Sequence, residues 1–424
     1  MYRMALSAAV FLLLLAGCAA KKTPPPLADI HGTVLLDRTT PYPGARVLIE
    51  GHPLATTDAD GKFTVTDVEL PYRTVIEMGS TSFIVYDGLT TALPTFGPPF
   101  AVRGALLKGE VQGAAGGRDL AVSLASPAAL GYDDLPPTID PGPRLYSIDA
   151  KMLTPSATGR VYALEWTRDA SGKVDAFTGY GTTAELLLAD GDHLTGLDIT
   201  LDPLPAAHDL QVSASAPSDY DVLGVITGVR PWPEDQLGLS LLTGFAPPPF
   251  PATVRAPHIP GARMMLELFV AEPGGSDIAG ISWTSVPVIA PSASLTFPVP
   301  RPQPLGPADG ATGVGAGGEL SWTTSAGSLS MLQLTGDVMI FAYTNEPRFT
   351  LPDLSAFGAD YGSAAVYTWK VYEFGLEGLT STDALLESRE APQSGLLYAL
   401  LAGKIFNERG GYFVTTPERT FTTP

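Results

Sequence analysis

Cysteine is almost absent from this sequence: Cys18 is the only one among 424 residues. A single thiol cannot form an internal disulfide, so packing and hydrogen bonding must hold the folded chain together. Histidine is also scarce, and none of the five has a glutamate three residues on or belongs to an HExxH pair: His31, His52, His193, His208 and His258. The usual zinc motifs of a hydrolase are therefore missing, and we expect neither a metal nor a cofactor.

Basic residues are outnumbered, with 25 Lys and Arg against 44 Asp and Glu, a formal net charge of −19. A surface this negative repels nucleic acid, which we exclude as a partner. No serine lies in a G-x-S-x-G elbow, and no G-x-x-x-x-G-K-[ST] phosphate loop occurs. Residues 313–318 match G-x-G-x-x-G, but strand-like residues follow them where a dinucleotide site needs a helix. The sequence thus predicts no catalytic residues.

Long apolar runs are missing apart from one near the start, where Arg3 precedes the run from Ala5 to Leu15. This run is shorter than the ~20 residues of a membrane-spanning helix and is typical of a secretory signal. It ends in Leu15-Ala16-Gly17-Cys18, which resembles the lipobox of bacterial lipoproteins. The resemblance implies cleavage before Cys18, lipid attachment to its sulfur (hence palmitate) and, with Ala19 following, sorting to the outer membrane. A lipidated Cys18 would also be unavailable as a nucleophile.

Proline (40 residues) and glycine (45 residues) are frequent but follow no collagen-like period, which favours many short strands joined by turns. We predict an all-β protein of tandem β-sandwich domains with a small helical insertion in the last one. The predicted divisions are a signal peptide (1–17), a proline-stiffened lipidated tether (18–28), a first module (29–95), a second (96–205), a third (206–303) and a last module (304–424).

The first module combines alternating apolar residues with a tight turn at Asp58-Ala59-Asp60-Gly61. With Gly32-Thr33-Val34 and Pro43-Gly44-Ala45-Arg46-Val47, this turn resembles the carboxypeptidase regulatory-like family. The resemblance implies a transthyretin-type sandwich and covers the accessory domain only. Asp-x-Asp-Gly also overlaps the start of a calcium loop, although the third acidic position and the distal glutamate are missing. A structural turn, with aspartates accepting backbone hydrogen bonds, is the simpler interpretation.

The second and third modules echo one another. Each contains a proline loop, Asp134-Leu135-Pro136-Pro137 or Ala246-Pro247-Pro248-Pro249. Each then returns through a similar strand, Gly159 to Glu165 or Gly261 to Glu267. We interpret the two as β-sandwich modules of ordinary size, while a single larger domain over 96–303 stays open.

The last module resembles a fibronectin type III-like sandwich in Leu320-Ser321-Trp322, Phe349-Thr350-Leu351-Pro352 and Tyr367-Thr368-Trp369-Lys370-Val371. The insertion 375–412 departs from that family. Residues 380–383 in it form a capping box, and an apolar stripe at helical spacing follows: Leu396, Leu397, Leu400, Leu401 and Ile405. The stripe either packs on its own domain or meets a partner. Leu397 and Leu401 are therefore candidate partner contacts.

Three groups of neighbouring carboxylates could in principle serve glycoside hydrolysis: Asp133-Asp134, Asp190 with Asp192, and Glu234-Asp235. Each lies near Gly or Pro, so solvated turns are the alternative explanation. Among the tryptophans, Trp166, Trp283, Trp322 and Trp369 lie on strand-like segments and should be core. Trp232, between two prolines, should be exposed, which makes it the third candidate partner contact.

These observations predict a non-catalytic outer-membrane lipoprotein that presents β-sandwich domains for surface binding, adhesion or scaffolding. Its expected partners are the membrane, through the lipid, and a protein or polysaccharide. The alternative is a carbohydrate-binding lipoprotein that uses loop aromatics. A third hypothesis is a hydrolase whose carboxylates meet only in the fold.

Cys18→Ser should yield an uncleaved or soluble exported protein, because stable anchoring needs two or more acyl chains at about 0.8 kcal/mol per buried methylene. Mass spectrometry of fractionated cells checks both cleavage and acylation. Mature protein recovered with the inner membrane would contradict the outer-membrane assignment.

Overall fold

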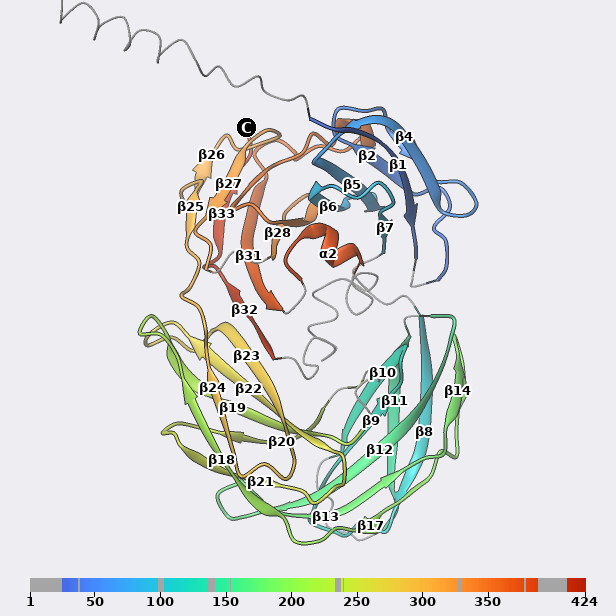
Figure 1. Ribbon diagram of the computed structural model, residues 1–424, viewed down its shortest axis with the longest axis vertical. Coiled ribbons are helices and arrows are strands. Elements are labelled where there is room, and N and C mark those ends of the chain that lie inside the picture. Colours follow the sequence, from blue (N-terminus) through green and yellow to red (C-terminus); the bar gives the residue numbers. More distant parts are fainter. Residues whose placement is uncertain are drawn as a thin grey trace, which may run out of the picture.

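The computed structural model describes residues 25–36, 39–97, 103–135, 142–152, 154–232, 238, 240–325, 329–376, 379–387 and 410–424. The lipobox with Cys18, the stripe with Leu397 and Leu401, and the pair Glu234-Asp235 lie outside these residues. Strand is the main secondary structure of the described chain and helix is rare, and the strands form several packed sheets, so the predicted all-β fold class is confirmed (Figure 1).

The first module contributes seven strands: β1 (Leu27–Val34), β2 (Arg46–Ile49), β3 (Ala55–Thr56), β4 (Lys62–Glu69), β5 (Tyr72–Gly79), β6 (Ser82–Leu89) and β7 (Thr95–Phe96). Strands β4, β1 and β7 form a small sheet of their own. Alternation explains the sandwich, because Val47 and Ile49 on β2 and Phe63 and Val65 on β4 turn inward and are buried.

The second module forms a ten-stranded sheet in the main order β15-β8-β11-β10-β9-β12-β13-β17. Its strands are β8 (Arg103–Gln112), β9 (Asp119–Ala125), β10 (Ala129–Leu135), β11 (Arg144–Met152), β12 (Ser156–Arg168), β13 (Val174–Thr182), β14 (Leu186–Ala189), β15 (His193–Leu194), β16 (Ile199–Thr200) and β17 (Asp202–Pro203). Because β12 is long, it pairs with β14 at one end and with both β9 and β13 at the other.

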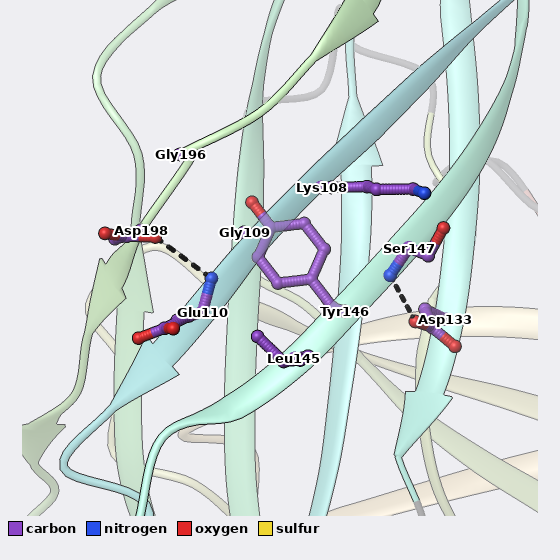
Figure 2. Close-up of a pocket in the computed structure, with 9 residues that line it drawn as sticks. All are labelled: Lys108, Gly109, Glu110, Asp133, Leu145, Tyr146, Ser147, Gly196 and Asp198. Carbon is purple, nitrogen blue, oxygen red and sulfur yellow. Dashed lines mark hydrogen bonds between the residues drawn. The ribbon is translucent and has the colours of Figure 1, made fainter.

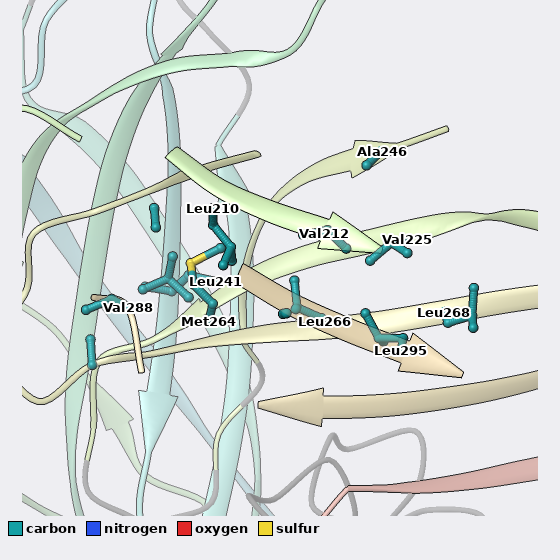
Figure 3. Packing of buried hydrophobic residues seen from close by; sticks show 14 of the residues in the cluster. Leu210, Val212, Val225, Leu241, Ala246, Met264, Leu266, Leu268, Val288 and Leu295 are labelled. Atoms are coloured by element: carbon teal, nitrogen blue, oxygen red, sulfur yellow. The ribbon is translucent and has the colours of Figure 1, made fainter. Parts of the chain in front are cut away.

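The third module has seven strands: β18 (His208–Ser215), β19 (Asp221–Arg230), β20 (Leu241–Ala246), β21 (Ala252–Ala256), β22 (Arg263–Ala271), β23 (Ile278–Pro287) and β24 (Ser292–Thr296). Strands β21, β18 and β24 form one sheet, and the other four belong to a much larger sheet. The two sheets enclose an apolar core that includes Leu210, Met264 and Leu295 (Figure 3).

The last module contains β25 (Pro304–Gly306), β26 (Ala311–Thr312), β27 (Glu319–Trp322), β28 (Leu329–Thr335), β29 (Met339–Thr344), β30 (Arg348–Thr350), a 3-10 turn η1 (Ser355–Phe357), β31 (Val366–Leu376), helix α2 (Thr382–Glu387), β32 (Gly411–Thr415) and β33 (Arg419–Thr422). The predicted inward residues Leu320, Trp322, Tyr367, Trp369 and Val371 are all buried in one core.

One sheet of 14 strands runs through three modules, with the main order β20-β19-β22-β23-β32-β31-β28-β29-β6-β5-β2-β3. Two junctions make it continuous. Strand β32 lies antiparallel between β23 of the third module and β31 of the last. Strand β29 of the last module pairs in parallel with β6 of the first. The second module joins through side chains, because Tyr162, Leu164 and Trp166 share the core of the third.

The turn at Asp58 is built as a structural turn. One Asp58 carboxylate oxygen accepts hydrogen bonds from the amides of Asp60 and Lys62, each at 2.9 Å. Gly61 has φ +71°, and a Cβ placed there would lie 2.4 Å from the Val34 carbonyl oxygen. Only glycine satisfies both conditions.

Gly61→Val should therefore destabilise the full chain by more than the ~1–3 kcal/mol of a forced left-handed residue, because the clash with strand β1 is added. Gly44→Val is the matched control, since its φ is +75° and nothing lies within 4 Å of an added Cβ. Urea unfolding of both variants checks the difference, and equal losses would contradict the clash.

Helix α2, the helical part of the insertion that the structure describes, packs on the first module. The Ser381 hydroxyl accepts the Ala384 amide at 3.0 Å, so the helix is capped at Ser381 and the predicted box starting at Thr380 is wrong by one residue. The Asp383 carboxylate, predicted to belong to the capping box, accepts hydrogen bonds from the amides of Thr90 and Thr91 and from the Thr90 hydroxyl. Leu385 is buried in a core that the first and last modules share.

Asp383→Ala should lower the free energy of unfolding by about 0.5–1.5 kcal/mol, because it removes hydrogen bonds to the partly exposed Thr90 and Thr91 amides. The exposed Asp175 on β13 provides the matched control, Asp175→Ala. Chemical denaturation of the full chain measures both, and a loss no greater than the control's would show that the contact is dispensable.

Candidate functional site

The candidate site lies where the edge of the second module's sheet is interrupted. Alongside β8, the chain forms two short parallel strands, β15 opposite Leu106 and Leu107 and β16 opposite Val111 and Gln112. Between them, residues 195–198 leave the regular pairing. The Leu197 amide still donates to the Lys108 carbonyl at 3.1 Å, which holds this break against β8.

Two residues fix the interruption in place. Gly109 on β8 allows the chain to approach, because a Cβ there would lie 2.2 Å from the Leu197 carbonyl oxygen. The Tyr146 hydroxyl on β11 donates to the same oxygen. Tyr146 is buried, and this burial, with the nearby Asp198 carboxylate, raises the pKa of its hydroxyl well above 10. The phenol therefore stays protonated and remains a donor.

An open groove of about 570 Å³ lies beside this break. Figure 2 shows its lining: Lys108, Gly109, Glu110, Asp133, Leu145, Tyr146, Ser147, Gly196 and Asp198. Leu145 is an apolar side chain on the surface, with 71% of its area exposed. The groove thus combines one exposed leucine with charged groups of both signs.

Two carboxylates of the groove are held by the main chain. Asp198 accepts the Glu110 amide at 3.1 Å, and Asp133 accepts the Ser147 amide at 2.7 Å (Figure 2). Lys108 adds an ammonium group and Glu110 a third carboxylate. The lining contains neither His nor Cys, so the groove offers hydrogen-bond donors and acceptors more readily than a nucleophile and its base.

Two of the three carboxylate groups noted in the sequence lie within the described residues, and main-chain amides or an arginine engage most of their side chains. Asp133 and Asp134 are consecutive on β10, so their side chains point to opposite faces. Partial burial, with Asp119 nearby, raises the pKa of Asp134. Asp190 pairs with Arg103 at 2.8 Å and accepts the Gly104 amide, whereas Asp192 accepts the Ala189 amide. Asp190 and Asp192 thus fit the turn interpretation, whereas Asp133 and Asp134 lie on a strand, so the turn interpretation is wrong for that pair.

Trp232 is buried, and the prediction that it is exposed is wrong. Only 4% of its surface is accessible, and its ring centroid lies 5.5 Å from that of Tyr162 in the second module. Prolines on both sides suggested a surface loop, but the large apolar ring fills a gap between modules. Trp232 is therefore no longer a candidate partner contact. The other four tryptophans are buried as predicted.

The groove was not predicted from the sequence, although Gly109 could have indicated that another segment approaches β8. A glycine inside an otherwise alternating strand marks a bulge or the close approach of another segment. Nothing in the sequence shows that residues 195–198 supply that segment. Across the described residues, no three His, Cys, Asp or Glu side chains gather into a metal-binding group. No described helix is long and apolar enough to cross a membrane.

Comparison with known proteins gives no family: no protein-family model matches the chain, and no curated protein matches it. Three solved structures show weak similarity to the chain. A candidate cell adhesion protein from Parabacteroides distasonis aligns over 59% of this chain and 92% of its own, with 8% identity and TM-score 0.18. A candidate adhesin from Bacteroides ovatus aligns over 42% and 81%, with 11% identity and TM-score 0.14. The minor pilin of Streptococcus agalactiae aligns over 46% and 98%, with 8% identity and TM-score 0.14.

Glu267 is a carboxyl group outside the groove whose pKa is raised. It lies on β22 between Ile226 and Trp283 of the adjacent strands, and burial raises its pKa from 4.5 to about 7. A shifted carboxyl can mark an active site when a specific charged partner contributes, but burial alone accounts for the raised pKa of Glu267. We therefore interpret Glu267 as a structural residue.

The raised pKa of Glu267 predicts the pH dependence of stability. Between pH 4.5 and 7 the folded chain keeps a proton that the unfolded chain loses, so the free energy of unfolding falls as pH rises through this window. The total fall is on the order of 3 kcal/mol. Glu267→Gln should remove this contribution, whereas Glu319→Gln, at an exposed site, should not. Urea unfolding at pH 5, 6, 7 and 8 tests the difference; parallel curves for both variants would contradict it.

Proposed function

We propose that the chain is a non-catalytic outer-membrane lipoprotein, anchored through Cys18, that presents a rigid β-sandwich body for surface binding or scaffolding. The groove beside the interrupted edge strand is its partner site. The lipobox-like sequence supports the anchor, and the joined modules support the rigid body. Expected partners are a protein or a polysaccharide of the cell surface.

The continuous 14-strand sheet is the observation that carries this proposal. A chain of independent modules would move at every linker, whereas backbone pairing across β23-β32-β31 and β29-β6 fixes the relative positions of three modules. The second module, which carries the groove, is not part of this sheet and is attached to the third module through their shared core. A body joined in these two ways suits a protein that must hold a binding surface in a constant orientation above a membrane.

The groove's chemistry favours a binding role over hydrolysis. Two of its carboxylates are engaged by main-chain amides, and Leu145 offers an apolar contact of the kind found at protein interfaces. The alternative, carbohydrate binding, is supported by the density of charged and hydroxyl groups in the same groove. It does not rest on Trp232, which is buried.

The double variant Lys108→Glu, Leu145→Asp tests the proposal. Both side chains line the groove, and the changes reverse its charge at one position and its polarity at the other. We expect binding of the immobilised full chain to cell-envelope extracts, measured by biolayer interferometry, to weaken at least about tenfold, or ~1.4 kcal/mol. Protease treatment of the extract should abolish binding if the partner is a protein and preserve it if the partner is a polysaccharide.

The matched control is Lys151→Glu with Leu187→Asp. These residues have similarly exposed side chains on the second module but do not line the groove. Equal binding by the groove variant, the control and the unmodified chain would place the partner site elsewhere. Turnover of a polysaccharide in the same extracts would instead support the hydrolase hypothesis.

A further inference from the structure

A second cavity lies at the junction of the second and third modules. It measures about 330 Å³ and is bounded by the start of β13, by β20 and β21, and by the connection between those two strands. Residues from both modules line it, with Lys173 and Val174 from the second and the remainder from the third. We call it the junction crevice.

Apolar side chains form one part of the wall of the junction crevice, beside polar groups such as Thr227 and Thr253. Val174, Ala252 and Val254 line it and also pack against the core that the two modules share. Pro247, Pro248, Pro249 and Pro251 also line it. Proline has no amide N–H, so this wall offers contact surface without hydrogen-bond donors.

The charged groups of the crevice are both cations, although the whole chain carries −19. Lys173 comes from the second module and Arg255 from the third. The Arg255 Nη1 atom lies 2.6 Å from the Asp209 carboxylate, an ion pair that engages one part of the guanidinium group. A guanidinium carries five N–H donors, and this bond uses one of them.

We propose that the junction crevice binds a small carboxylate that has an apolar body. The apolar body would lie against the valine and proline walls, and its carboxylate would reach Lys173 and Arg255. The volume is at the lower end of the range for small-molecule pockets, which favours a ring system or a medium-length chain. Because the two cations belong to different modules, the bound anion would bridge them.

The probe is 1-naphthoate, measured by isothermal titration calorimetry with the full chain. We expect one saturable site on the unmodified protein and at least tenfold weaker binding of the neutral analogue 1-naphthalenemethanol. Lys173→Gln with Arg255→Gln should weaken naphthoate binding at least tenfold. Decanoate and N-acetylphenylalanine, as competitors, distinguish a fatty acid from a peptide carboxylate as the source of the anion.

The control is Lys62→Gln with Lys151→Gln, two exposed lysines outside the crevice that also lie beside aspartates. It should bind naphthoate like the unmodified chain. Gly244→Val adds a second test, because an added Cβ lies 3.3 Å from the Thr227 hydroxyl and 3.7 Å from Val174, so the larger side chain would fill the crevice. Absence of saturable binding, or equal affinity in the charge variant and the control, would overturn the proposal.

Discussion

Strand β32 is the constraint on which the arrangement of the modules depends. Five residues, Gly411–Thr415, pair with β23 on one side and with β31 on the other. Glycines make this junction compact. A Cβ at Gly411 would lie 2.6 Å from the Trp283 ring, and one at Gly375 would overlap the Tyr412 ring. The aromatic rings thus occupy the space that a side chain at each glycine would need. This close packing and the backbone hydrogen bonds together fix the register of β32.

Arginines secure the first module to the last at the other junction. Arg46 pairs with Glu77 in its own module, donates to the carbonyls of Ala356 and Phe357 in the last, and lies over the Phe357 ring. Arg73 repeats the arrangement with Asp87, the Thr350 carbonyl and the Phe349 ring. A planar guanidinium can meet a carboxylate, a carbonyl and an aromatic face together, which lysine cannot do. Basic residues, scarce in this chain, thus serve at module contacts.

The sequence allowed the strands to be predicted far better than their partners. Alternation identified the inward residues of β27 and β31, and the Asp58 turn followed from local hydrogen bonding. The parallel pairing of β29 with β6 could not be anticipated, because it joins segments far apart in the sequence and no local pattern encodes that choice. The prediction that Trp232 is exposed was wrong for a related reason. Its proline neighbours describe the local chain, whereas its burial depends on Tyr162 in another module.

Both candidate binding sites occur where regular pairing stops. At the first, residues 195–198, between the short strands β15 and β16, leave the pairing with β8. Gly109 makes room for them, and the Tyr146 hydroxyl donates to the Leu197 carbonyl. At the second, prolines end β20 and separate it from β21. A regular sheet interior satisfies its own backbone groups and leaves little to offer a ligand, while an interruption exposes side chains held on rigid neighbours. The sheets, together with the core that the second and third modules share, give these interruptions fixed positions. Fixed positions reduce the entropy lost on binding.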